Sequence, residues 1–173
     1  MKTTFILFFL LLPLISISQQ SVIPYDKETQ KITFDKVYNA YGRSAEEVKK
    51  HGVSYLQSLG NRVSNINTDS ADFVTADIPF SFKGCKRCCL VDVMIKGHIK
   101  IYFKQVRTKI EISTFTYSGE TRAGTSGALE EVYSLPGCKT YVSFVNTFNA
   151  YMWSVVTGYH NYLKKALKNN EDW

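Results

Sequence analysis

The sequence has few of the residues that usually build a catalytic or metal centre. Its three histidines, His51, His98 and His160, lie far apart and show no ligand spacing such as H-E-x-x-H. No internal repeat occurs, and low complexity is confined to the first residues. These absences argue against a zinc hydrolase and a repeat protein. We therefore expect no catalytic site, no metal site and no cofactor.

Cysteine is also scarce, and its four copies are Cys85, Cys88, Cys89 and Cys138. An even number of cysteines favours disulfides in proteins that leave the cytoplasm. We expect one bridge from the cluster to Cys138, although the spacing leaves the pairing open. Metal binding or redox chemistry is the alternative, but a second pair of ligands is missing, and thioredoxin-like enzymes place C-x-x-C at a helix start rather than between strands.

Residues 1–18 have the three parts of a signal peptide. Lys2 is followed by an apolar run from Phe5 to Ile15, and then by small residues up to Ser18. The run is broken by Pro13 and is shorter than the roughly 20 apolar residues that cross a bilayer. No cysteine near the cut offers a lipid attachment site. We therefore expect an exported protein, periplasmic or secreted, with no transmembrane segment after cleavage.

Residues 19–173 have the length of a single domain with a core of its own. The formal net charge is +6, and removal of Lys2 lowers it by one. A basic protein outside the cytoplasm favours anionic partners, such as an acidic glycan, a lipid headgroup or an acidic envelope protein, over nucleic acid. The oligomeric state cannot be read from the sequence.

The first half of the domain predicts a strand and then a helix. Pro24 and Asp26 indicate an extended entry and a turn, and alternation over 32–38 indicates a strand. Ser44 and Glu47 have the spacing of a capping box, which marks a helix start. Apolar residues then recur at helical steps until Gly60 supplies a stop.

Antiparallel strands are predicted next. Alternation is clearest over 74–82, and it continues over 90–95, 98–103 and 106–112, with a bulge or turn at Gly97. Glycines indicate a surface loop over 120–139. Residues 140–169 have helical periodicity, with Trp153 and Tyr162 flanking the apolar stripe, where they would meet the first helix or a partner. We expect its buried face to comprise Val145, Phe148, Met152, Val155, Tyr159 and Leu163.

This order predicts an α+β domain, with a single antiparallel β-sheet and two helices packed on one face, in the order β-α-β-β-β-β-α. Outward positions of the meander then form a candidate anion-binding face. Its members are Lys100, Tyr102, Lys104, Arg107 and Lys109. The alternative is that these lysines protect an edge strand from pairing with another chain, and the position of the strands in the sheet decides between the two.

Several segments together resemble an exported Bacteroidetes domain of unknown function with a TBP-like fold. They are Ile23-Pro24, Lys31-Ile32-Thr33-Phe34, Ser44-Ala45-Glu46-Glu47, Ile99-Lys100-Ile101-Tyr102-Phe103 and Phe115-Thr116-Tyr117-Ser118-Gly119. The resemblance covers residues 23–119 and implies the fold and an exported setting, but no activity. The segment with Cys85, Cys88 and Cys89 departs from the family's pattern.

The best-supported function is therefore a non-catalytic binding or envelope-associated module of unknown ligand. One alternative is a carrier that holds a small hydrophobic ligand between the long helix and the sheet, which a buried cavity there would favour. The other is a thiol- or metal-dependent enzyme that uses the Cys85, Cys88 and Cys89 cluster.

Overall fold

The structure is a computed structural model, and it describes residues 23–40, 42–84, 90–121, 124–133 and 139–168. The predicted signal peptide and all four cysteines lie outside these residues. Within them, no helix is both long and apolar enough to cross a bilayer.

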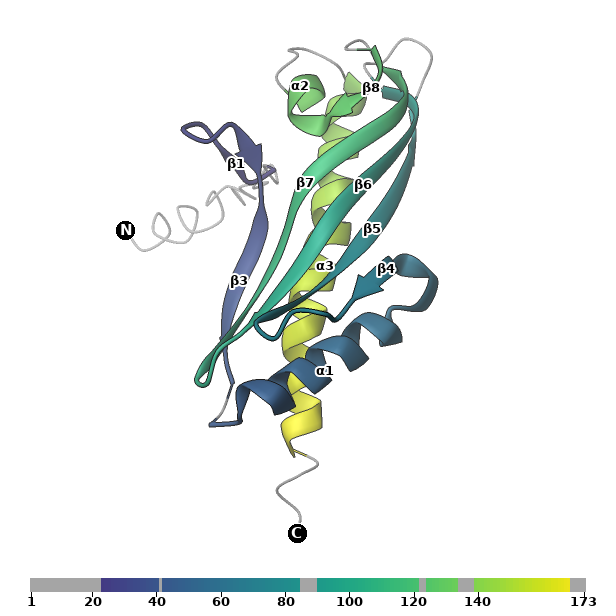
Figure 1. The fold of residues 1–173 in the computed structure, drawn as a ribbon. Coiled ribbons are helices and arrows are strands. Elements are labelled where there is room, and N and C mark those ends of the chain that lie inside the picture. Colours follow the sequence, from purple (N-terminus) through teal and green to yellow (C-terminus); the bar gives the residue numbers. More distant parts are fainter. Residues whose placement is uncertain (1–22, 41, 85–89, 122–123, 134–138, 169–173) are drawn as a thin grey trace, which may run out of the picture.

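The described part of the chain forms a two-stranded hairpin and a six-stranded antiparallel sheet (Figure 1). The main sheet has the order β3-β7-β6-β5-β4, and β8 also pairs with β7. The strands are β1 (Tyr25–Asp26), β2 (Lys31–Ile32), β3 (Phe34–Asn39), β4 (Ser64–Asn67), β5 (Phe73–Lys83), β6 (Leu90–Phe103), β7 (Arg107–Thr121) and β8 (Gly124–Ala128). The helices are α1 (Ala45–Ser58), α2 (Leu129–Tyr133) and α3 (Lys139–Lys168), with a 3-10 turn at Gly60–Arg62.

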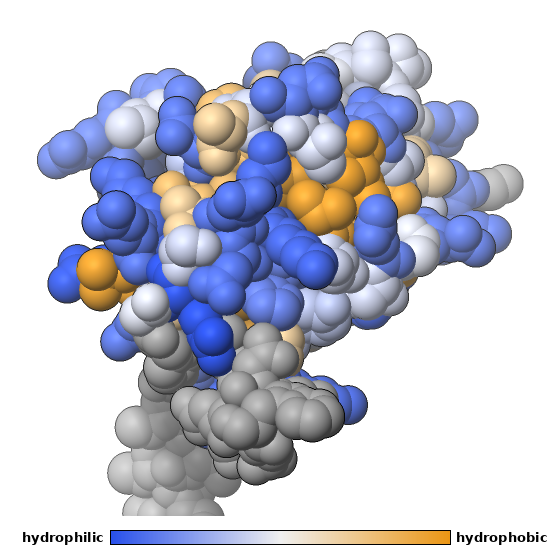
Figure 2. Space-filling model, turned by 60° about the horizontal axis from the view of Figure 1, so that its bottom comes forward, coloured by the Kyte–Doolittle hydropathy of each residue, from blue (hydrophilic) through white to orange (hydrophobic). Residues whose placement is uncertain are grey.

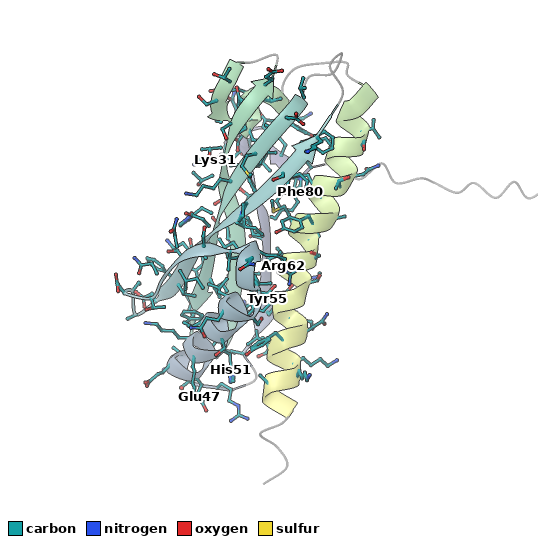
Figure 3. The ribbon with its side chains drawn as sticks, turned by 90° about the vertical axis from the view of Figure 1, so that its right-hand side faces the viewer. Lys31, Glu47, His51, Tyr55, Arg62 and Phe80 are labelled. Atoms are coloured by element: carbon teal, nitrogen blue, oxygen red, sulfur yellow. The ribbon has the colours of Figure 1, made fainter. Side chains whose placement is uncertain are left out.

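Helices α1 and α3 lie on the same face of this sheet. α3 runs along its length behind β7, β6 and β5, and α1 crosses at one end (Figures 1 and 3). Contacts join α1 to β5, β6 and α3, and α3 to β3 and β7. The predicted α+β class, with one main antiparallel sheet and two main helices on one face, is therefore confirmed.

Helix α1 begins and ends where the sequence predicts. The Ser44 hydroxyl accepts a hydrogen bond from the Glu47 backbone N–H at 3.2 Å, and the Glu47 carboxylate accepts one from the Ser44 N–H at 3.0 Å. Beyond the C-cap, Gly60 has φ +55°, a left-handed conformation that glycine adopts without steric cost. Both ends are thus specified locally.

The core lies between the sheet and the two helices. Val74, Ala76, Ile78 and their even-numbered neighbours on β5 are buried, as the alternation predicts. The predicted α3 face is confirmed as well, because each of its members is buried, namely Val145, Phe148, Met152, Val155, Tyr159 and Leu163.

Aromatic rings fill the middle of this core. The Phe148 ring centroid on α3 lies 5.6 Å from Phe34, 5.4 Å from Phe80, 5.2 Å from Phe115 and 5.3 Å from Phe144. Burying a side chain of this size contributes about 1.5–3 kcal/mol. These rings occupy the space in which a hydrophobic ligand would have to sit.

The two residues that flank the apolar stripe of α3 have different neighbours. Tyr162 packs against Tyr55 of α1, with ring centroids 5.7 Å apart, so the expected contact with the first helix is confirmed. Trp153 instead meets Phe34 of β3 edge-on, with centroids 5.6 Å apart, and remains 36% exposed.

The predicted loop over 120–139 is wrong where the structure describes it. β7 continues to Thr121, β8 pairs with it, and α2 follows. Gly127 pairs with Tyr117 in the β7–β8 ladder, and a Cβ there would lie 2.6 Å from Glu131 Oε2 and 3.3 Å from the Tyr117 ring. Glycine at this position makes room for packed side chains, and the sequence pattern was misread as flexibility.

The extended entry and turn predicted from Pro24 and Asp26 are present as the β1–β2 hairpin, where the Asp26 carboxylate accepts hydrogen bonds from the Glu28 N–H and the Thr29 hydroxyl. Two smaller expectations need correction. Strand β4 was not predicted at all. Val106, placed at the start of a strand, lies in the β6–β7 turn and is 61% exposed.

The bulge predicted near Gly97 is present, and β6 runs through it as one strand. The register shifts between Lys96 and His98, and the extra residue lies on β7. There Thr114 adopts φ +54°, which is unfavourable for a β-branched side chain.

Candidate functional site

The sheet has a second face, opposite α1 and α3, which we call the outer face. On the central strand β6, Lys96, His98, Lys100 and Tyr102 alternate with buried residues and are at least partly exposed. Their cross-strand neighbours on β5 and β7 share this face. Figure 3 shows α3 on one side of the sheet only.

The predicted basic residues come together at one end of this face. Lys100 and Tyr102 lie on β6, and Lys109 lies directly opposite Tyr102 on β7. Lys104 and Arg107 flank the β6–β7 turn. Because β6 and β7 are interior strands of the sheet, Lys100 and Lys109 do not guard an edge. The edge-protection explanation therefore fails for these two.

Lys109 is not available to a ligand in the way the sequence suggests. Its ammonium lies 3.0 Å from the Asp35 carboxylate and 2.8 Å from that of Glu111. Burial alone would lower the pKa of Lys109, but hydrogen bonds to Glu111 and Asp35 outweigh it and raise that pKa. Its charge is thus neutralised within the sheet.

Lys100 is held by rings instead. Its ammonium lies 3.9 Å from the centroid of Phe73 and 4.8 Å from that of Tyr102, both within cation–π range. The two rings belong to directly paired residues, with centroids 6.1 Å apart. In the described residues no carboxylate pairs with Lys100, Lys104 or Arg107. These three cations can therefore serve an anionic ligand.

Asp77 on β5 organises the neighbouring part of the outer face. Its carboxylate accepts hydrogen bonds at 2.7 Å from both Lys96 and Asn65, and His98 Nδ1 lies 3.3 Å away. Burial opposes ionisation of Asp77, but the hydrogen bonds from Lys96, Asn65 and His98 prevail, so the pKa of Asp77 is lowered. This cluster fixes Lys96 in place.

Several of these residues were missed in the sequence. They are Phe73, Asp77, Lys96 and His98. The signal on β6 was present, because Lys96, His98 and Lys100 share one parity of the strand, whereas the other parity carries apolar residues on both sides of Gly97, namely Ile95, Ile99, Ile101 and Phe103. Treating Gly97 as a break in the strand hid the fact that Lys96 and His98 continue the face of Lys100.

The remaining candidates do not form a site. His51 lies on α1, His98 on the outer face and His160 on α3, where its ring stacks on Tyr38 at 4.7 Å. Across the described ranges no cluster of three or more potential metal ligands occurs. The four cysteines fall outside those ranges, so their predicted bridge stays a prediction.

The end of the molecule that carries α1 and the β6–β7 turn is mainly hydrophilic. Figure 2 shows apolar side chains there as patches bordered by polar ones.

Comparison with known proteins identifies the fold. No protein family and no curated protein matches the sequence. Among solved structures, a TBP-like protein from Parabacteroides distasonis is similar with a TM-score of 0.64 at 12% identity, covering 82% of this chain and 97% of that one. A DUF4468 family protein from Bacteroides ovatus has a TM-score of 0.55 at 13% identity, covering 82% and 93%. This chain therefore has a TBP-like fold, as the Parabacteroides distasonis protein does.

Proposed function

We propose that the protein is an exported, non-catalytic binding module whose outer face holds an anionic ligand. The observation that carries this proposal is Lys100, whose ammonium rests on Phe73 and Tyr102 and has no carboxylate partner in the described residues. Lys104 and Arg107 add two exposed cations beside it. Such a local excess of positive charge attracts anions.

The packing favours this function over the hydrophobic-ligand carrier. A hydrophobic-ligand carrier needs space between α3 and the sheet, but the rings of Phe80, Phe115 and Phe148 occupy that space. A thiol- or metal-dependent enzyme would depend on Cys85, Cys88 and Cys89, which lie outside the described residues. The outer face is the surface whose chemistry the described residues support.

The test is salt-dependent binding to anionic vesicles and to an acidic polysaccharide. The triple variant Lys100→Glu, Lys104→Glu, Arg107→Glu should lose binding, and wild-type affinity should fall as salt screens the contacts. A matched control carries Lys50→Glu, Lys164→Glu and Lys165→Glu, three exposed helix positions with the same change of charge. Equal loss in both variants would show non-specific attraction and reject the proposal.

Lys109 provides a second control within the outer face itself. Because Asp35 and Glu111 already neutralise it, Lys109→Gln should reduce binding much less than Lys100→Gln. The reverse order would mean that the ligand displaces both carboxylates, and the assignment of Lys100 as the main contact would be wrong.

A further inference from the structure

We infer that the ligand of the outer face is a linear acidic polysaccharide with carboxylates spaced along it, bound along β6 in preference to a membrane surface. This inference rests on the proposed function and names its ligand class. It follows from three features of the outer face: the spacing of its cations, the carboxylates beside them and the rings next to Lys100.

Two cations with no carboxylate partner in the described residues are well separated along the direction of the central strand. Lys100 lies on β6, and Lys104 follows four residues later, directly after the strand ends at Phe103. Lys96 lies four residues before Lys100, but Asp77 already pairs with it. At about 3.3 Å per residue, positions four residues apart on a strand are roughly 13 Å apart, so a polymer that runs along β6 would meet separated positive charges.

Carboxylates lie beside these cations. Glu111 is directly opposite Lys100 on β7, Asp35 is opposite Glu111 on β3, and Asp77 is opposite His98 on β5 and binds Lys96. A bilayer rich in anionic lipid presents charge continuously, so it would press phosphates against all three carboxylates. A single polymer chain with separated charges covers a narrower strip, so it can contact Lys100 and Lys104 without covering Asp35 and Asp77, and charge complementarity therefore favours the polymer.

The rings supply the second kind of contact that a sugar needs. Phe73 and Tyr102 are directly paired, partly exposed and 6.1 Å apart, and both lie next to the Lys100 ammonium. The negative face of an aromatic ring attracts the polarised C–H groups on the flat side of a pyranose. One sugar can stack on a ring while its carboxylate reaches Lys100. A lipid phosphate has no flat C–H face that could stack in this way.

The experiment measures the affinity of the exported protein for three probes at several salt concentrations. They are hyaluronate, with a carboxylate on every second sugar; polygalacturonate, with one on every sugar; and phosphatidylcholine vesicles that contain phosphatidylglycerol. Hyaluronate should bind most tightly per charge. Lys100→Glu should weaken it about tenfold, equivalent to about 1.4 kcal/mol, whereas Lys164→Glu on α3 should not.

A ring variant separates stacking from charge. Phe73→Leu with Tyr102→Leu should weaken hyaluronate binding without changing the slope of log affinity against log salt, because that slope counts neutralised charges. Lys100→Gln should reduce the slope by about one. Heat unfolding verifies that each variant is folded, and Tyr102→Phe, which keeps the ring, should retain binding.

The possible results divide clearly. Binding to vesicles but not to hyaluronate overturns this inference and leaves the proposed function standing. Tighter binding to polygalacturonate than to hyaluronate also overturns it, because charge density would then outweigh spacing. Unchanged hyaluronate affinity in the folded ring variant removes the stacking argument and overturns it too. Binding to none of the three probes rejects the proposed function itself.

Discussion

The Phe115 ring covers Gly97 on the neighbouring strand. A Cβ at Gly97 would lie 2.5 Å from Phe115 Cε1 and 3.2 Å from Ile78 Cγ2. The Phe115 ring cannot easily move away, since it also packs against Phe34 and Phe148. The absence of a side chain at Gly97 therefore allows the bulged strand and the aromatic core to fit together.

Gly97→Ala should destabilise the fold by about 1–3 kcal/mol, the usual cost of overpacking a core. Urea unfolding followed by circular dichroism measures the change. Phe115→Leu alone is destabilising, but in combination with Gly97→Ala it should recover part of the loss, because the smaller side chain leaves space for the methyl group. Additive effects of the two substitutions would mean that ring and glycine are not coupled.

Thr114→Gly should stabilise the protein by up to about 1 kcal/mol. Thr114 is exposed and has φ +54°, and a non-glycine residue held in this region costs of order 1–3 kcal/mol, partly offset by the greater chain entropy of glycine when unfolded. The urea midpoint should rise with no change in slope. A lower midpoint would show that the threonine side chain makes a compensating contact, and Thr114→Asn, which also tolerates positive φ, would then be destabilising as well.

Local sequence signals predicted the parts of the fold that depend on local geometry. Ser44 and Glu47 determine where α1 begins through hydrogen bonds three residues apart, and alternation determines which side of β5 faces the core. β8 and α2 were missed because Gly127 resembles a loop residue until its contacts with Tyr117 are known. A glycine that makes room for a ring cannot be told apart, within one sequence, from a glycine that frees the backbone.

Tyr55→Phe should cost about 1 kcal/mol of stability, the net contribution of one hydrogen bond. The Tyr55 hydroxyl of α1 donates to the Val155 carbonyl of α3 at 2.5 Å in the core (Figure 3). Thermal unfolding measures the loss, and Tyr102→Phe on the outer face is a control that should change stability less. Equal effects would mean that this hydroxyl does not hold the two helices together.

The buried hydroxyl of Tyr55 also predicts that the protein unfolds at alkaline pH. Burial raises the pKa of Tyr55 above its ordinary value near 10, and that of Tyr159 likewise. A raised pKa means that the folded state retains the proton, so this stability is complete below about pH 10 and is lost as the pH rises further. Phenolate absorbance should therefore show tyrosines that ionise only together with unfolding.

The charges of the outer face could be predicted only in part. Parity placed Lys100, Tyr102 and Lys109 on one side of the sheet, and the strand pairing agrees. It could not reveal that Lys109 is neutralised, because Asp35 lies far away in the sequence and reaches Lys109 only through the β3–β7 pairing. Which cations remain for a ligand is decided by tertiary contacts.

The four cysteines give a prediction that is independent of the described residues. If one bridge joins Cys138 to the cluster of Cys85, Cys88 and Cys89, the unreduced protein should contain two free thiols, and reduction should double that number. Titration with a thiol reagent under denaturing, non-reducing conditions counts them. Four reactive thiols before reduction would reject the bridge and would favour the thiol- or metal-dependent alternative.

The charge of Asp77 on the outer face should make the folding stability depend on pH in the acid range, and Asp77→Asn tests this. The pKa of Asp77 is lowered in the folded protein because hydrogen bonds from Lys96, Asn65 and His98 outweigh its burial. A lowered pKa means that the contribution of Asp77 is complete above its ordinary pKa of about 4 and is lost as the pH falls through the folded value. Lys96 is more than half exposed, which limits the size of this contribution.

At pH 7 the Asp77→Asn variant should therefore be less stable than the wild type by about 1 kcal/mol. The difference should shrink as the pH falls below about 4, because protonation then removes the same charge from the wild type. Urea unfolding at several pH values measures it, with Asp69→Asn, an exposed aspartate in the β4–β5 connection, as the control. A difference that stays constant down to pH 2 would show that the asparagine is destabilising through its shape, and that Asp77 holds Lys96 and His98 without the help of its charge.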